Sequence, residues 1–475
     1  MKLIRRIALL LLTILIVVTS ASCKPSTTPT GTTETDSGLP DIELQNKNIV
    51  FYLGLGQSLE SLHAKDPKYP NPIDIFEDVY GGNVSLVNVD WNEYYTKLLA
   101  LFMADDMPDL LWPMPETFPK DIINNLIQPV DQYSEYLDIN DPIWDNTREY
   151  IELLSVNGKH YYPILTFSRP DMIAYNPKVF ALNELETPYS IYMNNRSEWT
   201  WDKLLELAKV LTQDTNNDGV IDQWGLAVGS SGSHLFQETT GVPFVDYSKE
   251  NGVVNNIKSP VIADAANFVR DLGPAKYNVL DPIESYNAYK NFLAGKDAMI
   301  ADIQWRIMGD YQGLWKEGKI EVAPMPRYPK TDTFYRSGYL FGYLIANKAK
   351  NPEGAALYIT CQKYAGSDEY KQKYGLDDPA VKYKSSDEMG IPREQYDLIE
   401  EYALDLQQFP VTITIWLGWY DKGWYNGFLD LNKEPWSQVI ARINPIFEKN
   451  IKKNLTKFDE IVNESSSEEG STSTP

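Results

Sequence analysis

The chain has 475 residues, a hydrophobic content of 43%, an aromatic content of 12% and a formal net charge of −23. This length allows two or three domains of ordinary size, and the apolar content excludes a wholly disordered chain. The negative charge argues against partners that need basic patches, such as nucleic acids and anionic lipid surfaces.

The N-terminal residues have the pattern of a secretion signal. Three basic side chains lie within the first six residues, and an almost unbroken apolar run follows from residue 7 to 18. This run is shorter than the ~20 residues that a membrane-spanning helix needs, so we interpret residues 1–22 as a signal peptide. Small residues lead directly into Cys23, as in a bacterial lipobox, although Ser20 stands where Leu is usual. We expect Cys23 to be lipidated; cleavage nearby without lipidation is the alternative.

The segments on either side of the folded part have compositions typical of flexible chains. Residues 23–46 start with a run rich in Thr, Ser, Pro and Gly, and residues 463–475 are rich in Ser and Glu. Neither segment can bury enough apolar surface to offset the entropy cost of ordering, so we expect a flexible tether and a disordered tail. Without residues 1–22 the net charge would be −26, because three basic side chains are lost. Cys361 is the only other cysteine, which excludes a disulfide framework, and its apolar surroundings predict a buried thiol.

Strands and helices alternate in the first part of the folded chain. An apolar, β-rich run begins at residue 48, and an amphipathic helix over residues 92–107 separates two further strands. This β-α-β-α-β order favours an α/β lobe with a largely parallel sheet. The predicted strands cover 48–57, 83–91 and 108–112, and two extended pieces follow within 158–180.

A capped helix is predicted next. The hydroxyl of Thr200 can accept a hydrogen bond from the first turn, and Trp199 can pack against Leu204 as a hydrophobic staple. Apolar residues at the spacing of an amphipathic helix continue to Leu211.

The acidic loop after this helix contains most of a calcium-binding pattern. Oxygen-bearing side chains stand at loop positions one, three, five and nine, a glycine stands at position six, and position seven offers a backbone carbonyl. Gly225 occupies position twelve, where a bidentate Glu is usual, so calcium would need a carboxylate from elsewhere. The alternative is a turn rich in Asp and Asn that joins helix to strand. The candidate calcium ligands are Asp214, Asn216, Asp218, Val220 and Asp222.

The rest of the chain continues this mixture, without an internal repeat. A helix stopped by Gly295 is followed by a strand that delivers Gln304 and Trp305 at its end. We predict helices over 259–272, 285–295, 351–366, 394–408 and 435–455, strands over 298–303, 319–326 and 338–347, and an aromatic segment over 410–428.

The usual sequence patterns of enzymes are missing. None of the three histidines, His63, His160 and His234, is paired with another His or a Cys at metal-ligand spacing, which argues against a catalytic zinc site. No nucleophile elbow, phosphate-binding loop or Cys/His pair is present. A glycosidase-like pair of carboxylates stays open at this point, because acidic residues are abundant.

Several of the twelve tryptophans stand where predicted strands end. Flat aromatic faces stack on the C–H faces of sugar rings, and neighbouring polar side chains bond the hydroxyls. We therefore expect at least one of these tryptophans to line a ligand cleft; packing in a core is the alternative for each. They are Trp112, Trp305, Trp416 and Trp419.

The order of these features over residues 45–460 resembles that of bacterial extracellular solute-binding proteins of the maltose- and oligosaccharide-binding type (family 1). The resemblance is carried by PDLLW after an amphipathic helix and by GKHYYPI followed by IAYNPKVF. It continues through WTWDKLLELAKVLTQDTNNDGVIDQWG, FLAGKDAMIADIQWR, and KIEVAPMPRYP leading to SGYLFGYLIANKAKNPEGAALYI.

This resemblance implies a periplasmic-binding-protein-like α/β fold, in which two lobes joined by a hinge close over a ligand. One lobe would hold residues 45–166 and 302–348, and the other residues 167–301 and 349–462. Trp112, Trp305 and Trp419 would be stacking platforms, and Gln57, Arg169 and Asp302 would be hydrogen-bond partners. The full set of implied cleft residues is Gln57, Trp112, Arg169, His234, Phe236, Asp302, Trp305, Tyr339, Trp416 and Trp419.

The resemblance also implies a function. The protein would capture an oligosaccharide at the extracellular face of the cell membrane, as a lipid-anchored monomer, and deliver it to the permease of an ABC transporter. It would catalyse no reaction and would require no cofactor; a structural calcium ion in the acidic loop stays open. Two alternatives stay open: a surface enzyme that degrades polysaccharides, and a sugar-sensing or adhesion module that feeds no transporter.

Overall fold

A computed structural model describes residues 39–54, 56–167, 170–229, 234–283, 285–413, 419 and 434–469 of the chain. Contacts between Cα atoms divide the chain into Met1–Ser37 and Gly38–Pro475, and the description below concerns the second unit. The predicted signal peptide, Cys23 and most of the tether lie outside the described residues. Within the described part, no helix combines the length and the hydropathy that crossing a bilayer requires.

The first sheet has four strands in the order β13-β3-β1-β2. β1 (Asn48–Leu53) is parallel to β2 (Asn83–Asn88) and to β3 (Leu110–Leu111), whereas β13 (Leu344–Ile345) is antiparallel to β3. Most residues of β1 are buried, as its continuous apolar run predicts for a strand covered on both faces. The predicted parallel arrangement is therefore confirmed for β1, β2 and β3.

Helices from distant parts of the sequence cover this sheet. α2 (Pro72–Tyr80) packs against α14 (Pro352–Ala365), and α14 also contacts β1 and β13. α3 (Tyr94–Met103) connects β2 to β3. Ten of the fourteen residues of α14 are buried, among them Cys361, and burial raises the pKa of its thiol.

The second sheet has the order β10-β5-β9-β6. β5 (Asp171–Tyr175) is antiparallel to both β9 (Met299–Ile303) and β10 (Glu321–Pro324), and β6 (Ala227–Val228) is parallel to β9. All five residues of β5 are buried. This sheet is therefore mixed, with antiparallel pairs on both sides of β5 and one parallel pair between β6 and β9.

Helices surround the second sheet as well. α8 (Trp201–Leu211) buries the apolar face that its sequence predicts, and α11 (Ser285–Leu293) contacts β6 and β9. α18 (Arg393–Leu404) contacts β10. The other α-helices are α1 (Leu59–Leu62), α4 (Thr117–Ile123), α5 (Arg148–Leu153), α6 (Pro177–Leu182), α7 (Pro188–Asn194), α9 (Leu235–Glu238), α10 (Pro260–Leu272), α12 (Gln304–Met308), α13 (Gln312–Lys316), α15 (Asp368–Tyr374), α16 (Pro379–Lys382), α17 (Lys384–Met389) and α20 (Trp436–Glu469).

Two pairs of short strands accompany the passages of the chain between the sheets. β4 (Thr166–Phe167) pairs antiparallel with β12 (Leu340–Phe341), and β11 (Arg336–Gly338) pairs parallel with β14 (Val411–Ile413). β4 leads into β5 of the second sheet, and β12 leads into β13 of the first sheet. These pairs are the crossover segments that a two-lobe fold requires.

Two hydrophobic cores divide the chain differently from the predicted lobes. β10 belongs to the second sheet, although residues 302–348 were predicted for the first lobe. α14 and α20 pack in the first core, although residues 349–462 were predicted for the second lobe. The prediction is wrong for these segments, because hydrophobic periodicity shows that a segment is buried but does not show on which of two sheets it packs.

A hairpin and a helix from the second part of the chain also reach the first core. β7 (Val245–Ser248) pairs with β8 (Gly252–Asn255), and residues of this hairpin pack with the first core. α10 places Ile262 and Ala266 in the first core and other residues, including Val269, in the second. α10 is thus shared between the two cores.

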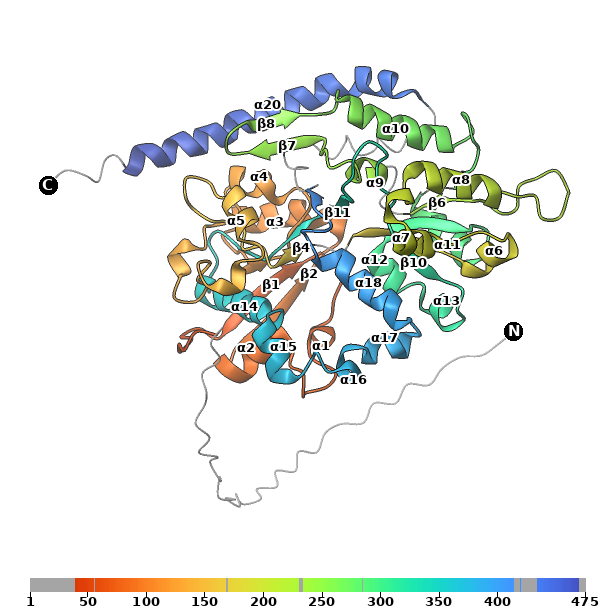
Figure 1. The fold of residues 1–475 in the computed structure, drawn as a ribbon. Coiled ribbons are helices and arrows are strands. Elements are labelled where there is room, and N and C mark those ends of the chain that lie inside the picture. Colours follow the sequence, from red (N-terminus) through yellow and green to blue (C-terminus); the bar gives the residue numbers. More distant parts are fainter. Residues whose placement is uncertain are drawn as a thin grey trace, which may run out of the picture. The chain divides into compact units, whose positions relative to one another are not determined.

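The long C-terminal helix α20 runs beside this hairpin and α10 (Figure 1). It also packs on α4. Its last residues, 463–469, are helical, whereas a disordered tail was predicted from residue 463. Residues 470–475 lie outside the described part of the chain.

An aromatic cluster joins α4, the hairpin and α20. The ring of Trp419 lies 6.2 Å from that of Phe118, 5.9 Å from that of Tyr247 and 5.4 Å from that of Phe458, measured between centroids. Trp419 is fully buried. The structure therefore places Trp419 in the first core, and the prediction of an open stacking platform at this position is wrong.

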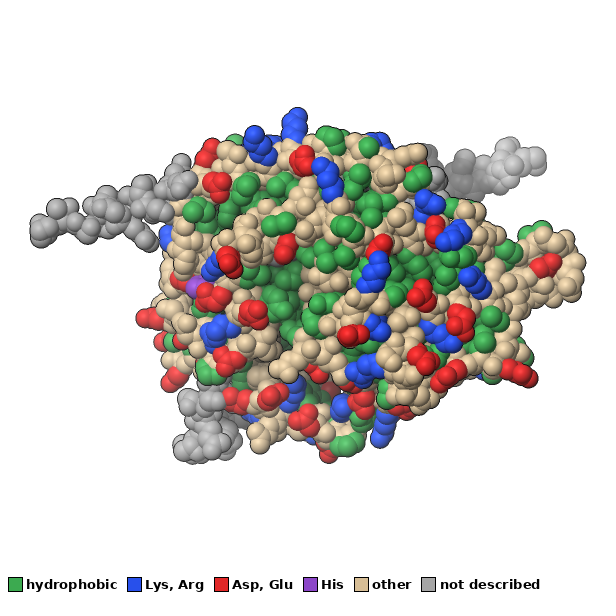
Figure 2. All heavy atoms as spheres, turned by 45° about the horizontal axis from the view of Figure 1, so that its top comes forward, with side chains coloured by type: hydrophobic (Ala, Val, Ile, Leu, Met, Phe, Trp, Pro, Cys, Tyr) green, Lys and Arg blue, Asp and Glu red, His purple; other side chains and the backbone are tan. Residues whose placement is uncertain are grey.

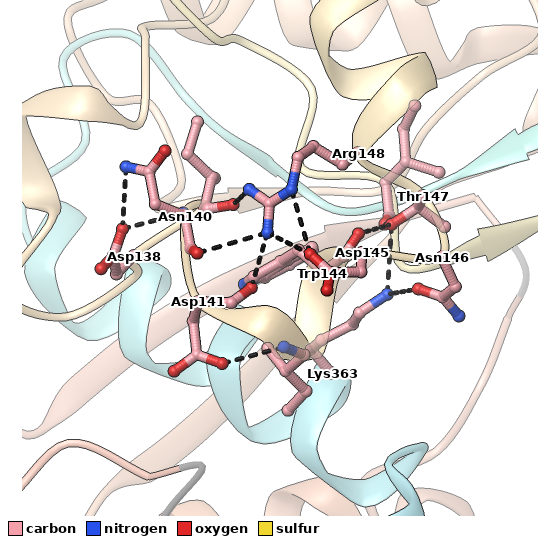
Figure 3. Close-up of polar contacts among 12 residues, drawn as sticks. Asp138, Asn140, Asp141, Trp144, Asp145, Asn146, Thr147, Arg148 and Lys363 are labelled. Atoms are coloured by element: carbon pink, nitrogen blue, oxygen red, sulfur yellow. Dashed lines mark hydrogen bonds and ion pairs between the residues drawn. The ribbon is translucent and has the colours of Figure 1, made fainter.

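The segment around residues 138–148 is fastened by two basic side chains (Figure 3). Arg148 donates hydrogen bonds to the carbonyl oxygens of Ile139 and Asp141 and forms an ion pair of 2.7 Å with Asp145. Lys363 from α14 donates to Asn146 Oδ1 at 2.8 Å. These contacts hold a segment with little regular structure against α14.

Candidate functional site

Three loops of the first sheet lie at the same edge of it, namely the edge formed by the carboxyl ends of its parallel strands. β1 leads to Gln57, β2 ends at Asn88 and β3 leads to Trp112. The side-chain amide of Asn88 donates to the carbonyl oxygen of Gln57 at 2.7 Å, which ties two of these loops together. Trp112 is half-buried, and its ring packs against that of Phe341 with 5.0 Å between centroids.

The second sheet offers a comparable edge. The parallel strands β6 and β9 end at Val228 and Ile303, and the antiparallel strand β5 begins beside Ile303 with Asp171. Residues 304–308 form α12, which starts at this edge. Trp305 is 54% exposed, and it is the one exposed tryptophan among those that the structure describes.

The charged groups behind Trp305 are buried and paired. Arg306 is 4% exposed and Asp302 is fully buried, and Arg306 Nε lies 3.4 Å from Asp302 Oδ2. The hydroxyl of Tyr311 donates to the same carboxylate oxygen at 2.6 Å, and burial together with the charge of Asp302 raises the pKa of that hydroxyl. The sequence predicted Asp302 as a hydrogen-bond partner of the ligand, and the structure shows it engaged within the protein.

Gln304 is a buried polar residue that the sequence did not single out as part of the site. Its side chain is fully buried, and neither amide atom has a hydrogen-bond partner in the described part of the chain. Burying an amide without partners costs free energy. The sequence places Gln304 between a predicted strand and Trp305, but it does not show that the amide is buried without a partner.

A short buried helix follows the end of β6. His234 precedes α9 and is buried, and burial lowers its pKa to about 4, so its imidazole is neutral at physiological pH. Glu238 on the same helix is also buried, and burial together with the negative charge of Asp171 raises its pKa well above the usual range. Phe236 packs edge-on against both Trp201 and Phe268, which stack on each other, in the second core. Phe236 was predicted to line a cleft, but no part of its side chain is exposed here.

Buried polar groups also hold the crossover segments. Ser337 Oγ donates to Asp171 Oδ2 at 2.8 Å, and the guanidinium of Arg336 donates to the carbonyl oxygens of Ser337 and Ala403. Burial lowers the pKa of Arg336 to about 10, so it stays charged. These contacts link β5, β11 and the end of α18 beside the second edge.

The predicted site residues therefore fall into three groups. Gln57, Trp112 and Tyr339 are half-buried and Trp305 is exposed, so these four have surface to offer a ligand. His234, Phe236, Asp302 and Trp419 are buried. Arg169 and Trp416 lie outside the described residues. In Figure 2, hydrophobic side chains gather in the middle of the face shown and charged side chains surround them.

The acidic loop is folded on itself through hydrogen bonds. Asp214 accepts from the backbone N–H groups of Asp218 and Gly219, and Asp222 accepts from the backbone and hydroxyl of Thr215. Asn217 and Gly219 have positive φ angles, as tight turns of this composition require. In the described part of the chain no three His, Cys, Asp or Glu side chains are placed to hold a metal ion. Calcium binding by this loop stays a prediction.

Comparison with known proteins identifies the family of the chain. Residues 72–383 match the family described as bacterial extracellular solute-binding protein. A comparison of the sequence with curated proteins finds no match.

Several solved structures are similar to the chain. An ABC substrate-binding protein of Listeria monocytogenes in complex with cycloalternan is 18% identical, with 86% of this chain and 99% of that chain covered and a TM-score of 0.59. The galacto-N-biose-/lacto-N-biose I-binding protein of Bifidobacterium longum is 14% identical, with 90% and 98% covered and a TM-score of 0.59. UgpB of Mycobacterium tuberculosis, in complex with glycerophosphocholine, is 14% identical, with 86% and 100% covered and a TM-score of 0.60. These similarities show a periplasmic-binding-protein-like fold.

Proposed function

Because the chain belongs to the family of bacterial extracellular solute-binding proteins, we propose that it captures a carbohydrate outside the cell and delivers it to the permease of an ABC transporter. An oligosaccharide is the expected ligand. Structures of similar fold have been solved with cycloalternan and with lacto-N-biose, which supports a sugar as the ligand class.

The exposed indole of Trp305 carries the proposal within this structure. It stands at the edge where β9 and β6 end, which is the position where α/β folds bind ligands. An exposed aromatic face is suited to stack on a sugar ring, and Trp112 at the end of β3 offers a second, half-buried ring. The amide of the half-buried Gln57 can both donate and accept hydrogen bonds, as hydroxyl groups require.

The proposed mechanism is binding without a chemical step. The open form admits the solute, and the closed form binds it more tightly, so the ligand shifts the population toward the closed form. The permease would then recognise the closed form. Family membership supports a binding protein over an enzyme.

We further propose that the protein acts as a monomer anchored to the outer face of the cell membrane by a lipid on Cys23. The apolar run before Cys23 and the Thr- and Pro-rich segment after it support this anchor. Metabolic labelling with palmitate tests it. Label should enter the wild-type protein and be absent from a Cys23→Ala variant; equal labelling of both would contradict the anchor.

A thermal-shift screen over mono- and oligosaccharides tests the ligand class, since a ligand that binds only the folded state raises the melting temperature. Trp305→Ala should weaken binding of the sugar found by about tenfold or more, which corresponds to ~1.4 kcal/mol. Trp224→Phe is the matched control, because Trp224 is half-buried and precedes β6 at the opposite end of the strand. If no sugar shifts the melting temperature, the carbohydrate proposal is wrong. Cleavage of the bound sugar would instead favour the enzyme alternative.

A further inference from the structure

A buried guanidinium lies against the exposed tryptophan of the second edge. The Cζ atom of Arg306 is 5.0 Å from the centroid of the Trp305 ring, within the range of a cation–π contact. Arg306 is almost fully buried, whereas Trp305 is more than half exposed. The guanidinium therefore covers the protein side of the indole and leaves its outer surface available.

Arg306 lies among two aromatic rings and two carboxylates. Its Cζ atom lies 4.2 Å from the ring centroid of Tyr289 in α11, so the guanidinium contacts two aromatic rings. Its Nε lies 3.4 Å from Asp302 Oδ2, and its Nη1 lies 3.8 Å from Asp310 Oδ2. A guanidinium that lacked these partners would be costly to bury.

Asp302 is in turn held rigidly. Its Oδ2 accepts the hydroxyl of Tyr311, and its Oδ1 accepts the backbone N–H of Ile303 at 2.9 Å. Gly229 lies against it so closely that a Cβ there would be 2.3 Å from Asp302 Oδ1. Asp302 therefore has no room to turn toward a ligand, but it can hold Arg306 in place.

We propose that Asp302 and Arg306 are positioning residues of the binding site. Asp302 fixes Arg306, and Arg306 fixes the orientation of the Trp305 indole before the ligand arrives. A preorganised ring avoids the entropy cost of ordering it on binding. The proposal rests on the proposed function only for the nature of the ligand that stacks on the ring.

The first test needs no ligand. In protein labelled with 5-fluorotryptophan, the ¹⁹F resonance of Trp305 is assigned by its loss in Trp305→Phe. Arg306→Gln should shift this resonance and leave those of the buried Trp144 and Trp199 unchanged, and Arg306→Lys, which keeps the charge, serves if Arg306→Gln does not fold. Arg393→Gln is the matched control, because Arg393 also pairs with a carboxylate, at 3.0 Å, and lies 4.8 Å from a tyrosine ring. An unmoved Trp305 resonance in the Arg306 variant would overturn the proposal.

The second test is a double-mutant cycle with the sugar that the screen identifies. Arg306→Gln should weaken binding about fivefold in the wild-type background and have no further effect in Trp305→Ala, because the cation–π contact acts only through the ring. Asp302→Asn should behave in the same way. Independent, multiplicative losses would show that Arg306 acts elsewhere and would overturn the proposal. If no sugar binds at all, the proposed function fails, while the ¹⁹F measurement still decides whether Arg306 positions Trp305.

Discussion

Replacement of Asp297 by Asn should remove a large pH dependence of stability. Asp297 precedes β9 and is 2% exposed. Burial and the nearby carboxylate of Asp281 raise its pKa to about 8. Asp281 cannot turn away, because its oxygens accept from the backbone N–H of Ile283 at 3.0 Å and from the amide of Asn291 at 2.7 Å.

The sign follows from the number of protons that each state binds. The folded chain keeps the proton on Asp297 up to about pH 8, whereas the unfolded chain releases it near pH 4. Between these values the folded state binds more protons, so the free energy of unfolding falls as the pH rises. One proton corresponds to about 1.4 kcal/mol per pH unit, or about 4 kcal/mol between pH 4 and pH 7.

Guanidinium-induced unfolding at several pH values between 4 and 8 measures this effect. Asn has the shape of Asp but does not ionise, so the Asp297→Asn protein should equal the wild type near pH 4 and exceed it by about 3 to 4 kcal/mol near pH 7. Asp387→Asn, at an exposed carboxylate, is the control and should show no such divergence. A difference between Asp297→Asn and the wild type that stays constant with pH would refute the reasoning.

Three further predictions concern packing and metal binding. Gly225→Ala should lower the free energy of unfolding by about 1–3 kcal/mol, because the added Cβ would lie 2.0 Å from the carbonyl oxygen of Ala208. In Gly313→Ala the added Cβ would meet no atom within 4 Å, so this control should not destabilise the protein. Calorimetry compares the two variants. Trp419→Phe should lower the melting temperature without changing sugar affinity, since Trp419 is buried in the aromatic cluster; a loss of affinity at unchanged stability would restore it to the site. Isothermal titration of chelator-treated protein with Ca²⁺ tests the acidic loop. If the loop binds calcium, the wild type should give a binding heat and the Asp214→Asn variant should give none. The absence of heat from the wild type at millimolar Ca²⁺ would contradict the hypothesis.

Local features were well predicted from the sequence. The helix over Trp201–Leu211 has the predicted apolar face. Thr200 is its N-cap residue, but its side chain makes no capping bond. The strand that delivers Trp305 was also found, since an apolar run that ends in a tryptophan is visible in the sequence.

Relations between distant segments could not be predicted in the same way. Trp419 follows an aromatic run that could end either in a cleft or in a core, and its burial depends on Phe118, Tyr247 and Phe458 from three other elements. Likewise, the family resemblance implied that Asp302 would bind a ligand, and only the geometry of Tyr311 and Arg306 shows that its Oδ2 is already used within the protein. Side-chain direction at a strand end depends on neighbours that the local sequence does not specify.

The composition of the first core has a consequence for how the chain folds. This core takes residues from Leu44 to Phe167 and again from Val439 to Phe458, so it joins the two ends of the folded sequence. The N-terminal segments cannot complete their packing until α20 has been synthesised. Contacts of such large sequence separation must overcome a large loop-closure entropy before they gain packing energy, which slows folding. Truncation within α20 should therefore damage the sheet formed by β1, β2 and β3, more than three hundred residues earlier in the chain.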